Sequence, residues 1–180
     1  MKKLNRISPF HTFLLSILVY LFLYGNPGMC QDWGAGKISL LPDSSFALVE
    51  IEKGKKIRHC PHHNANGKLD EEQLIYVLGN FDNEIWVDHT NREVAEKHLT
   101  QHYDKFMTRV MKKGLQRPIN INQAKLTELV ALPRVGAVLA VRIVKYRESI
   151  SSFATIEQIK QVDGIGTATF NAIKFYITVK

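Results

Sequence analysis

The stretch QVDGIGTATFNAIKFY, residues 161–176, places two glycines around one isoleucine between two apolar runs. On both sides of the glycines, apolar residues recur at helical spacing. Glycine reaches positive φ without a Cβ clash, so Gly164 can end one helix and allow a tight return. Gly166 then leaves bare backbone N–H groups at the start of the next helix, where an anion is attracted. The stretch therefore predicts two helices joined by a hairpin that can bind an anion.

The same pattern occurs thirty residues earlier in the chain. The sequence LVALPRVGAVLAVRI (129–143) aligns without a gap with IKQVDGIGTATFNAI (159–173). Repetition at a fixed spacing indicates one supersecondary unit that is used twice. The corresponding hairpin residues are Arg134, Val135 and Gly136 in the first copy, and Gly164, Ile165 and Gly166 in the second.

Further motifs accompany the two hairpins. They are NINQA at 120–124, EL at 128–129, LP at 132–133, YR at 146–147, Phe153 and Ile156. In this order, the residues resemble the ComEA-type tandem helix-hairpin-helix (HhH) module of bacterial competence DNA receptors. The resemblance implies a mainly α fold, in which a C-terminal tandem HhH domain at 119–180 follows a small α+β region. It says nothing about residues 31–117.

The resemblance also implies how the module acts. Each hairpin of the family presents backbone N–H groups to one phosphate, and two hairpins grip duplex DNA across the minor groove without reading its bases. Family members often also hold a monovalent cation in the hairpin. The residues expected to contact DNA are the hairpin positions Arg134, Val135, Gly136, Gly164, Ile165 and Gly166, and the basic side chains Arg142, Lys145, Lys160 and Lys174.

The first hairpin departs from the family pattern, because Arg134 replaces the first glycine of the usual Gly-hydrophobic-Gly. Its charge would lie near the phosphate, or its side chain would disturb the turn. In addition, Val138 and Ala168 stand where many DNA-binding members place Lys or Arg. We therefore expect mostly main-chain contacts with DNA. A scaffold that binds envelope proteins through the HhH fold, without DNA, is the alternative.

The charge of the chain is unevenly distributed. The formal net charge is +7, yet residues 31–117 carry 13 basic and 13 acidic side chains. Residues 118–180 carry eight basic and four acidic side chains. A modest basic surface favours polyanions through the release of counterions, so the charge pattern agrees with double-stranded DNA as a partner.

Residues 1–30 have the pattern of a secretory signal peptide. Three basic residues precede the apolar run FLLSILVYLFLY (13–24), and a cleavage site follows Cys30. The run is short for a membrane-spanning helix. Lipidation at Cys30 and retention as an anchor are the alternatives. We expect an exported protein, periplasmic or on the extracytoplasmic face of the inner membrane, which touches the membrane only through this segment.

Between the signal and a short linker at 115–118, residues 31–114 predict a small α+β domain. The segment 37–60 is typical of short strands, with turns at Pro42-Asp43 and Lys53-Gly54. Two helices are predicted to follow. The first covers 69–79 and ends at Gly79. The second covers 90–113, begins with a capping box of Thr90 with Glu93 and ends at Gly114.

Histidines and the second cysteine indicate a zinc site in this domain. Cys60 and His63 would lie in a turn, and His98 and His102 are one helical turn apart. These four side chains could hold a structural Zn²⁺ tetrahedrally. The alternative is that the histidines pack in the core with hydrogen-bond partners, while Cys60 is buried or pairs with another chain.

Two weaker patterns indicate other ion chemistry. HHNANGKLDEEQ (62–73) resembles a calcium loop but lacks the bidentate glutamate at its last position. In WVDHTN (86–91), Asp88 and His89 could activate water at a divalent ion, as in a nuclease. Neither forms a convincing catalytic constellation. We therefore expect a protein that binds DNA independently of base sequence, as in DNA uptake. Envelope or DNA-uptake proteins are further expected partners. We do not expect an enzyme.

Overall fold

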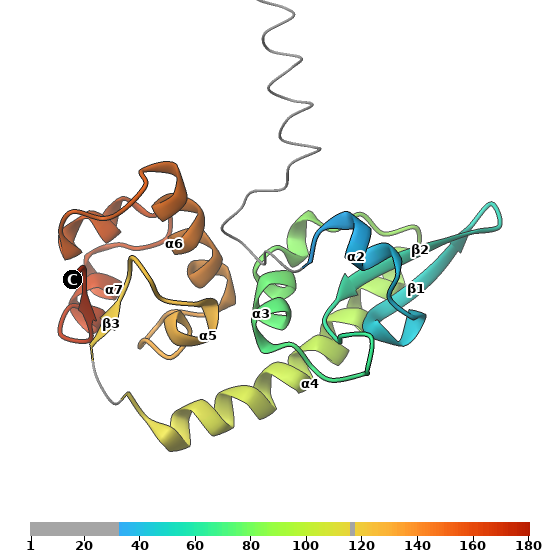
Figure 1. Cartoon of the computed structure of the whole chain (residues 1–180), viewed down its shortest axis with the longest axis horizontal. Coiled ribbons are helices and arrows are strands. Elements are labelled where there is room, and N and C mark those ends of the chain that lie inside the picture. The colour runs from blue at the N-terminus through green and yellow to red at the C-terminus, as the bar shows by residue number, and fades with distance from the viewer. Residues whose placement is uncertain (1–32, 116–117) are drawn as a thin grey trace, which may run out of the picture.

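The computed structural model describes residues 33–115 and 118–180 (Figure 1). The expected signal peptide and the middle of the expected linker lie outside the described residues. The described chain is mainly helical, with a small β-hairpin in its first half, which confirms the expected fold class. Its elements are α2 (Ala35–Ser39), η1 (Asp43–Ser45), β1 (Phe46–Glu52), β2 (Lys55–Pro61), α3 (Glu71–Gly79), η2 (Phe81–Asn83), α4 (His89–Lys113), β3 (Ile119–Asn120), α5 (Leu126–Leu129), α6 (Ala137–Ser149), η3 (Ile156–Gln161), α7 (Thr167–Ile173) and β4 (Ile177–Thr178).

Strands β1 and β2 form an antiparallel hairpin, with Glu52 opposite Lys55 at its tip. Between them, Lys53 and Gly54 have φ values of 49° and 78°. Positive φ at both central residues is the geometry of a tight hairpin turn, because its twist matches that of the strands. The turn expected at these two residues is confirmed.

The segment before this hairpin is helical, where the sequence predicted a strand. Its turns close through backbone bonds from Ile38 N to the Gly34 carbonyl at 3.1 Å and from Leu41 N to the Ile38 carbonyl at 3.2 Å. The helix brings Trp33 and Leu41 into one apolar cluster. An extended strand would hold these two residues about 26 Å apart, so burial of both favours the helix.

Helix α4 begins one residue earlier than expected, and its cap is Asp88. The Asp88 carboxylate accepts hydrogen bonds from the Thr90 backbone N–H at 2.9 Å and from the Thr90 hydroxyl at 2.8 Å. The capping box predicted from Thr90 and Glu93 is therefore wrong, because the Thr90 hydroxyl is a donor to Asp88. The helix ends at Gly114, whose φ is 66°, as expected.

The C-terminal domain contains α5, α6, η3 and α7 around a single apolar core. A short parallel pair of strands joins its two ends, with Ile119 opposite Ile177. The core also includes Ile75 of α3 and Phe106 of α4. Figure 1 shows α4 running from beneath the β-hairpin toward this domain. The two halves of the chain thus share buried apolar surface.

Helix α3 approaches the C-terminal domain through a glycine. A Cβ built at Gly79 would lie 2.5 Å from Val141 Cγ2 and 2.8 Å from the Ala137 carbonyl oxygen. Only glycine allows this approach of α3 to α6. The sequence predicted that Gly79 ends its helix, but Gly79 is still helical and Asn80 is the C-cap.

Glu72 of α3 caps the first helix of the C-terminal domain. Its carboxylate accepts hydrogen bonds from the backbone N–H groups of Leu126 at 2.9 Å and Thr127 at 3.0 Å, and from the Thr127 hydroxyl. These donors at the start of α5 would otherwise lack an acceptor. The N-terminal half is thereby fixed to α5 as well as to α6.

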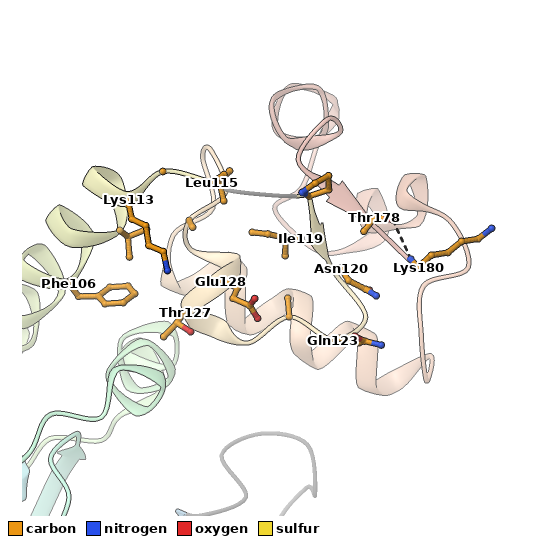
Figure 2. A pocket seen from close by; sticks show the side chains of 15 residues that line it. Phe106, Lys113, Leu115, Ile119, Asn120, Gln123, Thr127, Glu128, Thr178 and Lys180 are labelled. Carbon is orange, nitrogen blue, oxygen red and sulfur yellow. Dashed lines mark hydrogen bonds between the residues drawn. The ribbon is translucent and has the colours of Figure 1, made fainter.

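A hollow of about 700 Å³ lies between the end of α4, β3 and α5. Figure 2 shows that Lys113, Thr127 and Glu128 line it together with apolar side chains such as Phe106 and Ile119.

Across residues 33–115 and 118–180, the helices are too short or too polar to cross a lipid bilayer.

Candidate nucleic-acid interface

The two hairpins of the C-terminal domain have the same backbone geometry. The glycine before α6, Gly136, has φ −90° and ψ −177°, and Gly166 before α7 has φ −86° and ψ −177°. Two residues earlier, φ is positive in both copies, at 65° for Arg134 and 88° for Gly164. The repeat in the sequence is thus a repeat in three dimensions, and Arg134 does not prevent the turn.

Each hairpin is anchored by its central apolar residue. Val135 and Ile165 are buried, and their backbone N–H groups donate to the carbonyls of Leu132 at 3.1 Å and Val162 at 3.0 Å. Burial of these side chains points the tips of the hairpins outward. Residues on either side of the anchors, including Gly136 and Gly166, are exposed.

The helix starts behind both hairpins are open. In the described part of the chain, no side chain caps α6 at Gly136 or α7 at Gly166. The first amides of a helix have no intrahelical acceptor, and together with the helix dipole they favour an anion. No other described atom would lie within 4 Å of a Cβ at either glycine. A phosphate could therefore approach the backbone at both places.

The two hairpins are neighbours on the surface. A Cβ at Gly164 would lie 2.8 Å from Leu139 Cδ2 and 3.0 Å from Arg142 Nη1. Leu139 belongs to the first turn of α6, three residues after Gly136, which is a rise of about 5 Å. The second hairpin thus packs against the helix that starts at the first.

The predicted basic residues differ in their surroundings. Arg142 Nη1 lies 2.8 Å from Asp163 Oδ2 and also donates to the Asp163 carbonyl at 3.2 Å. It therefore ties α6 to the second hairpin and stands beside the open helix start. Asp163 is an acidic hairpin residue that the sequence analysis did not single out, and the Arg142 guanidinium offsets its charge at the second hairpin. Arg134 is exposed at the first hairpin.

Each of the three predicted lysines contacts another side chain. Lys145 donates to Asn80 Oδ1 at 2.7 Å, so it links α6 to the end of α3. Lys160 lies over the ring of Phe170 at 5.1 Å, and Lys174 lies over the ring of Phe175 at the same distance. Lys145 therefore serves the contact between the two halves.

Of the four residues predicted to bind zinc, the three histidines lie in one cluster and Cys60 lies apart from them. His63 and His102 come together with His62, and their ligand nitrogens lie within 4.8 Å of one another. His98 lies beside this group, with its Nε2 3.0 Å from His62 Nε2. Cys60 is buried in an apolar cluster with residues such as Leu74 and Leu99, so His62 stands where Cys60 was expected.

The asparagines and carboxylates of the other two ion patterns have structural partners. Asn64 Oδ1 accepts the backbone N–H groups of Asn66 and Lys68, both at 3.0 Å. Asp70 caps α3 through the Gln73 N–H at 3.0 Å. Asp88 caps α4, so the side chains of Asn64, Asp70 and Asp88 all have hydrogen-bond partners within the chain.

Known proteins resemble the C-terminal part of the chain. A family model described as the helix-hairpin-helix motif matches residues 115–178. ComE operon protein 1 of Bacillus subtilis (strain 168) is 48% identical over 62 residues, which are 34% of this chain and 30% of that protein.

Eukaryotic proteins match a stretch of similar length. Endonuclease/exonuclease/phosphatase family domain-containing protein 1 is 42% identical over 64 residues in Xenopus laevis and 41% identical over 64 residues in Homo sapiens. The matched stretch is 36% of this chain but only 12% and 11% of those proteins. No solved structure gives a significant match.

The chain thus spans less than a third of the length of these relatives, and the likeness concerns one domain. That domain has the two hairpins, the buried apolar anchors and the glycine-led helix starts described above. Residues 115–178 are a helix-hairpin-helix domain of the ComEA type.

Proposed function

We propose that this protein binds double-stranded DNA through the two hairpins, without preference for base sequence. The observation that carries the proposal is the pair of exposed, uncapped helix starts at Gly136 and Gly166, which share one backbone geometry. Backbone amides at such positions favour a phosphate oxygen. The domain's likeness to ComE operon protein 1 supports a role in competence.

Independence of sequence follows from the kind of contact. Phosphates are the same at every base pair, so amides that bind phosphates fix the position of the duplex but carry no base information. Arg134 and Arg142 add positive charge at the two hairpins. Counterions that they displace from the DNA would make the affinity depend on salt.

We also propose that the protein acts outside the cytoplasmic membrane. The support is the amino-terminal sequence pattern, in which basic residues precede the apolar run at 13–24. A DNA-binding surface in that position could capture DNA from outside the cell. Fractionation of cells that express the full-length chain would test this: protein found only in the cytoplasm contradicts it.

DNA binding is tested by Gly136→Val and Gly166→Val, singly and together, in the full-length chain. Both backbones are extended and both sites are open, so valine fits the fold but puts methyl groups where the phosphate approaches. A hydrogen bond to a charged group contributes roughly 1.5–3 kcal/mol. We therefore expect each substitution to weaken binding at least about 10-fold, measured by fluorescence anisotropy with duplexes of unrelated sequence.

Gly34→Val is the matched control. Gly34 is also the extended N-cap of a helix, with φ −62° and ψ 160°, and no other described atom would meet its Cβ within 4 Å. It lies outside the C-terminal domain, so its substitution should leave DNA affinity unchanged. If the wild type does not bind at low salt, or if the hairpin variants bind as well as Gly34→Val, the protein is a scaffold rather than a DNA-binding protein.

A further inference from the structure

Four histidines converge where β2 ends and α4 passes beside it. His62 and His63 follow β2, and His98 and His102 lie one turn apart on α4. The ring centroid of His62 lies 4.2 Å from that of His63, 5.0 Å from that of His98 and 5.3 Å from that of His102. Those of His98 and His102 are 4.9 Å apart. The two segments are distant in sequence, and only the fold brings these rings together.

The hydrogen bond of His62 fixes which of its nitrogens faces the cluster. Its Nδ1 lies 2.9 Å from the Cys60 carbonyl oxygen, which can only accept, so Nδ1 carries the proton. Nε2 therefore carries the lone pair, and it accepts a hydrogen bond from His98 Nε2 at 3.0 Å. A backbone carbonyl that holds the far N–H of an imidazole is the usual support of a metal-bound histidine.

One buried nitrogen in the cluster lacks a partner among the described residues. His63 Nδ1 is buried, and no described atom forms a hydrogen bond with it. A buried polar atom without a partner costs about 1–3 kcal/mol, so such atoms usually have an unseen partner.

We propose that His62, His63, His98 and His102 bind one Zn²⁺ ion. Two nitrogens about 2.0–2.1 Å from a tetrahedral Zn²⁺ are about 3.4 Å apart. The Nε2 atoms of His62 and His98 are 3.0 Å apart, and the ligand nitrogens of His62, His63 and His102 lie within 4.8 Å of one another, so rotation of the four side chains closes the site. The ion occupies the space between the rings and takes the lone pair of His62 Nε2.

Four protein nitrogens leave no open position on a tetrahedral ion, so the zinc is structural. It ties the end of β2 to α4, the helix that also reaches the C-terminal domain. Residues His98 and His102 are only partly buried, which gives the ion a path from solvent. Cys60 is not a ligand, because its side chain is buried in the apolar cluster with Leu74 and Leu99.

The test uses the full-length chain, purified through a tag that binds no metal and stripped with a chelator. Titration with Zn²⁺ should give one equivalent bound and raise the melting temperature by roughly 5–10 °C at saturation, whereas Mg²⁺ and Ca²⁺ should not. Co²⁺ should give the visible absorption of a tetrahedral site without a thiolate charge-transfer band. Binding below about 0.2 equivalents, or a thiolate band, overturns the proposal.

Substitutions separate these ligands from other histidines. His102→Gln, which changes a partly exposed side chain, should weaken zinc binding at least 10-fold and abolish the thermal shift. His98→Gln should do the same and guards against a failure of one variant to fold. The matched control is His89→Gln, an exposed histidine on the same helix, and Cys60→Ser tests the cysteine. If the control loses zinc as much as His102→Gln, or Cys60→Ser loses it, the assignment is wrong.

Discussion

The second hairpin contains two glycines that the structure assigns to different tasks, and alanine should separate them. Gly164 has φ +88°, and its Cβ would lie 2.8 Å from Leu139 Cδ2. Gly166 has φ −86° and open space around its Cβ position. We expect Gly164→Ala to destabilise the fold and Gly166→Ala to leave its stability nearly unchanged.

The magnitudes follow from the two environments. A residue with a side chain in the left-handed region costs about 1–2 kcal/mol, and movement of Leu139 away from the new methyl adds about 1 kcal/mol. The lower entropy of the unfolded alanine chain returns about 0.4–1 kcal/mol. Gly164→Ala should therefore lower the free energy of unfolding by about 2 kcal/mol. For Gly166→Ala, the same entropy gain is offset by the loss of a favoured N-cap, which leaves about zero.

Urea denaturation of the full-length variants, followed by circular dichroism, measures both values. The midpoint should fall for Gly164→Ala at an unchanged m-value and stay in place for Gly166→Ala. Equal losses in the two variants would refute the assignment of Gly164 to the turn and Gly166 to ligand approach. The distinction matters for DNA assays, because reduced binding by a Gly164 variant can reflect a distorted hairpin.

Two further substitutions test single features of the structure. Arg134→Gly should raise the free energy of unfolding by roughly 0.5–1 kcal/mol, because it relieves the strain of φ +65°. It should also reduce the salt dependence of DNA binding by about one phosphate contact. Unchanged stability in urea would show that the turn is unstrained. Burial opposes ionisation of Glu50, but hydrogen bonds from Asn91, Asp88, Val87 and His59 outweigh it and lower its pKa from 4.5 to about 2. Ionised Glu50 thus stabilises the fold above pH 4.5. On the order of 3 kcal/mol of this stabilisation is lost as the pH falls to 2. The difference in unfolding free energy between wild type and Glu50→Gln should therefore vanish across that range in acid titrations.

The repeat was predictable from sequence because local rules determine it. Glycines, apolar spacing and the thirty-residue offset are visible in the printed chain, and the backbone angles of Gly136 and Gly166 agree within a few degrees. The turn at Arg134 was harder to judge, since arginine rarely adopts positive φ. Burial of Val135 holds the turn in place and outweighs that local preference.

Contacts between distant segments were not predictable. The sequence indicated a helix end at Gly79, but the glycine is required by Val141 and Ala137, which lie in another domain. It indicated Cys60 as a zinc ligand because its spacing to His63 is suitable. The structure brings His62 to the cluster instead, because Cys60 is still part of β2 and its side chain packs in the apolar cluster.

The helices of the C-terminal domain differ in whether the chain itself provides an acceptor for their first backbone N–H groups, and this difference supports the proposal that the hairpins bind phosphate. At α5, the chain supplies its own anion, since the Glu72 carboxylate accepts from the amides of Leu126 and Thr127. At α6 and α7, glycine leads the helix, and within the described residues no side chain fills the same role. One start is thus closed by a carboxylate from α3, and the two at the exposed hairpins are left open, as the proposed contact with phosphate requires.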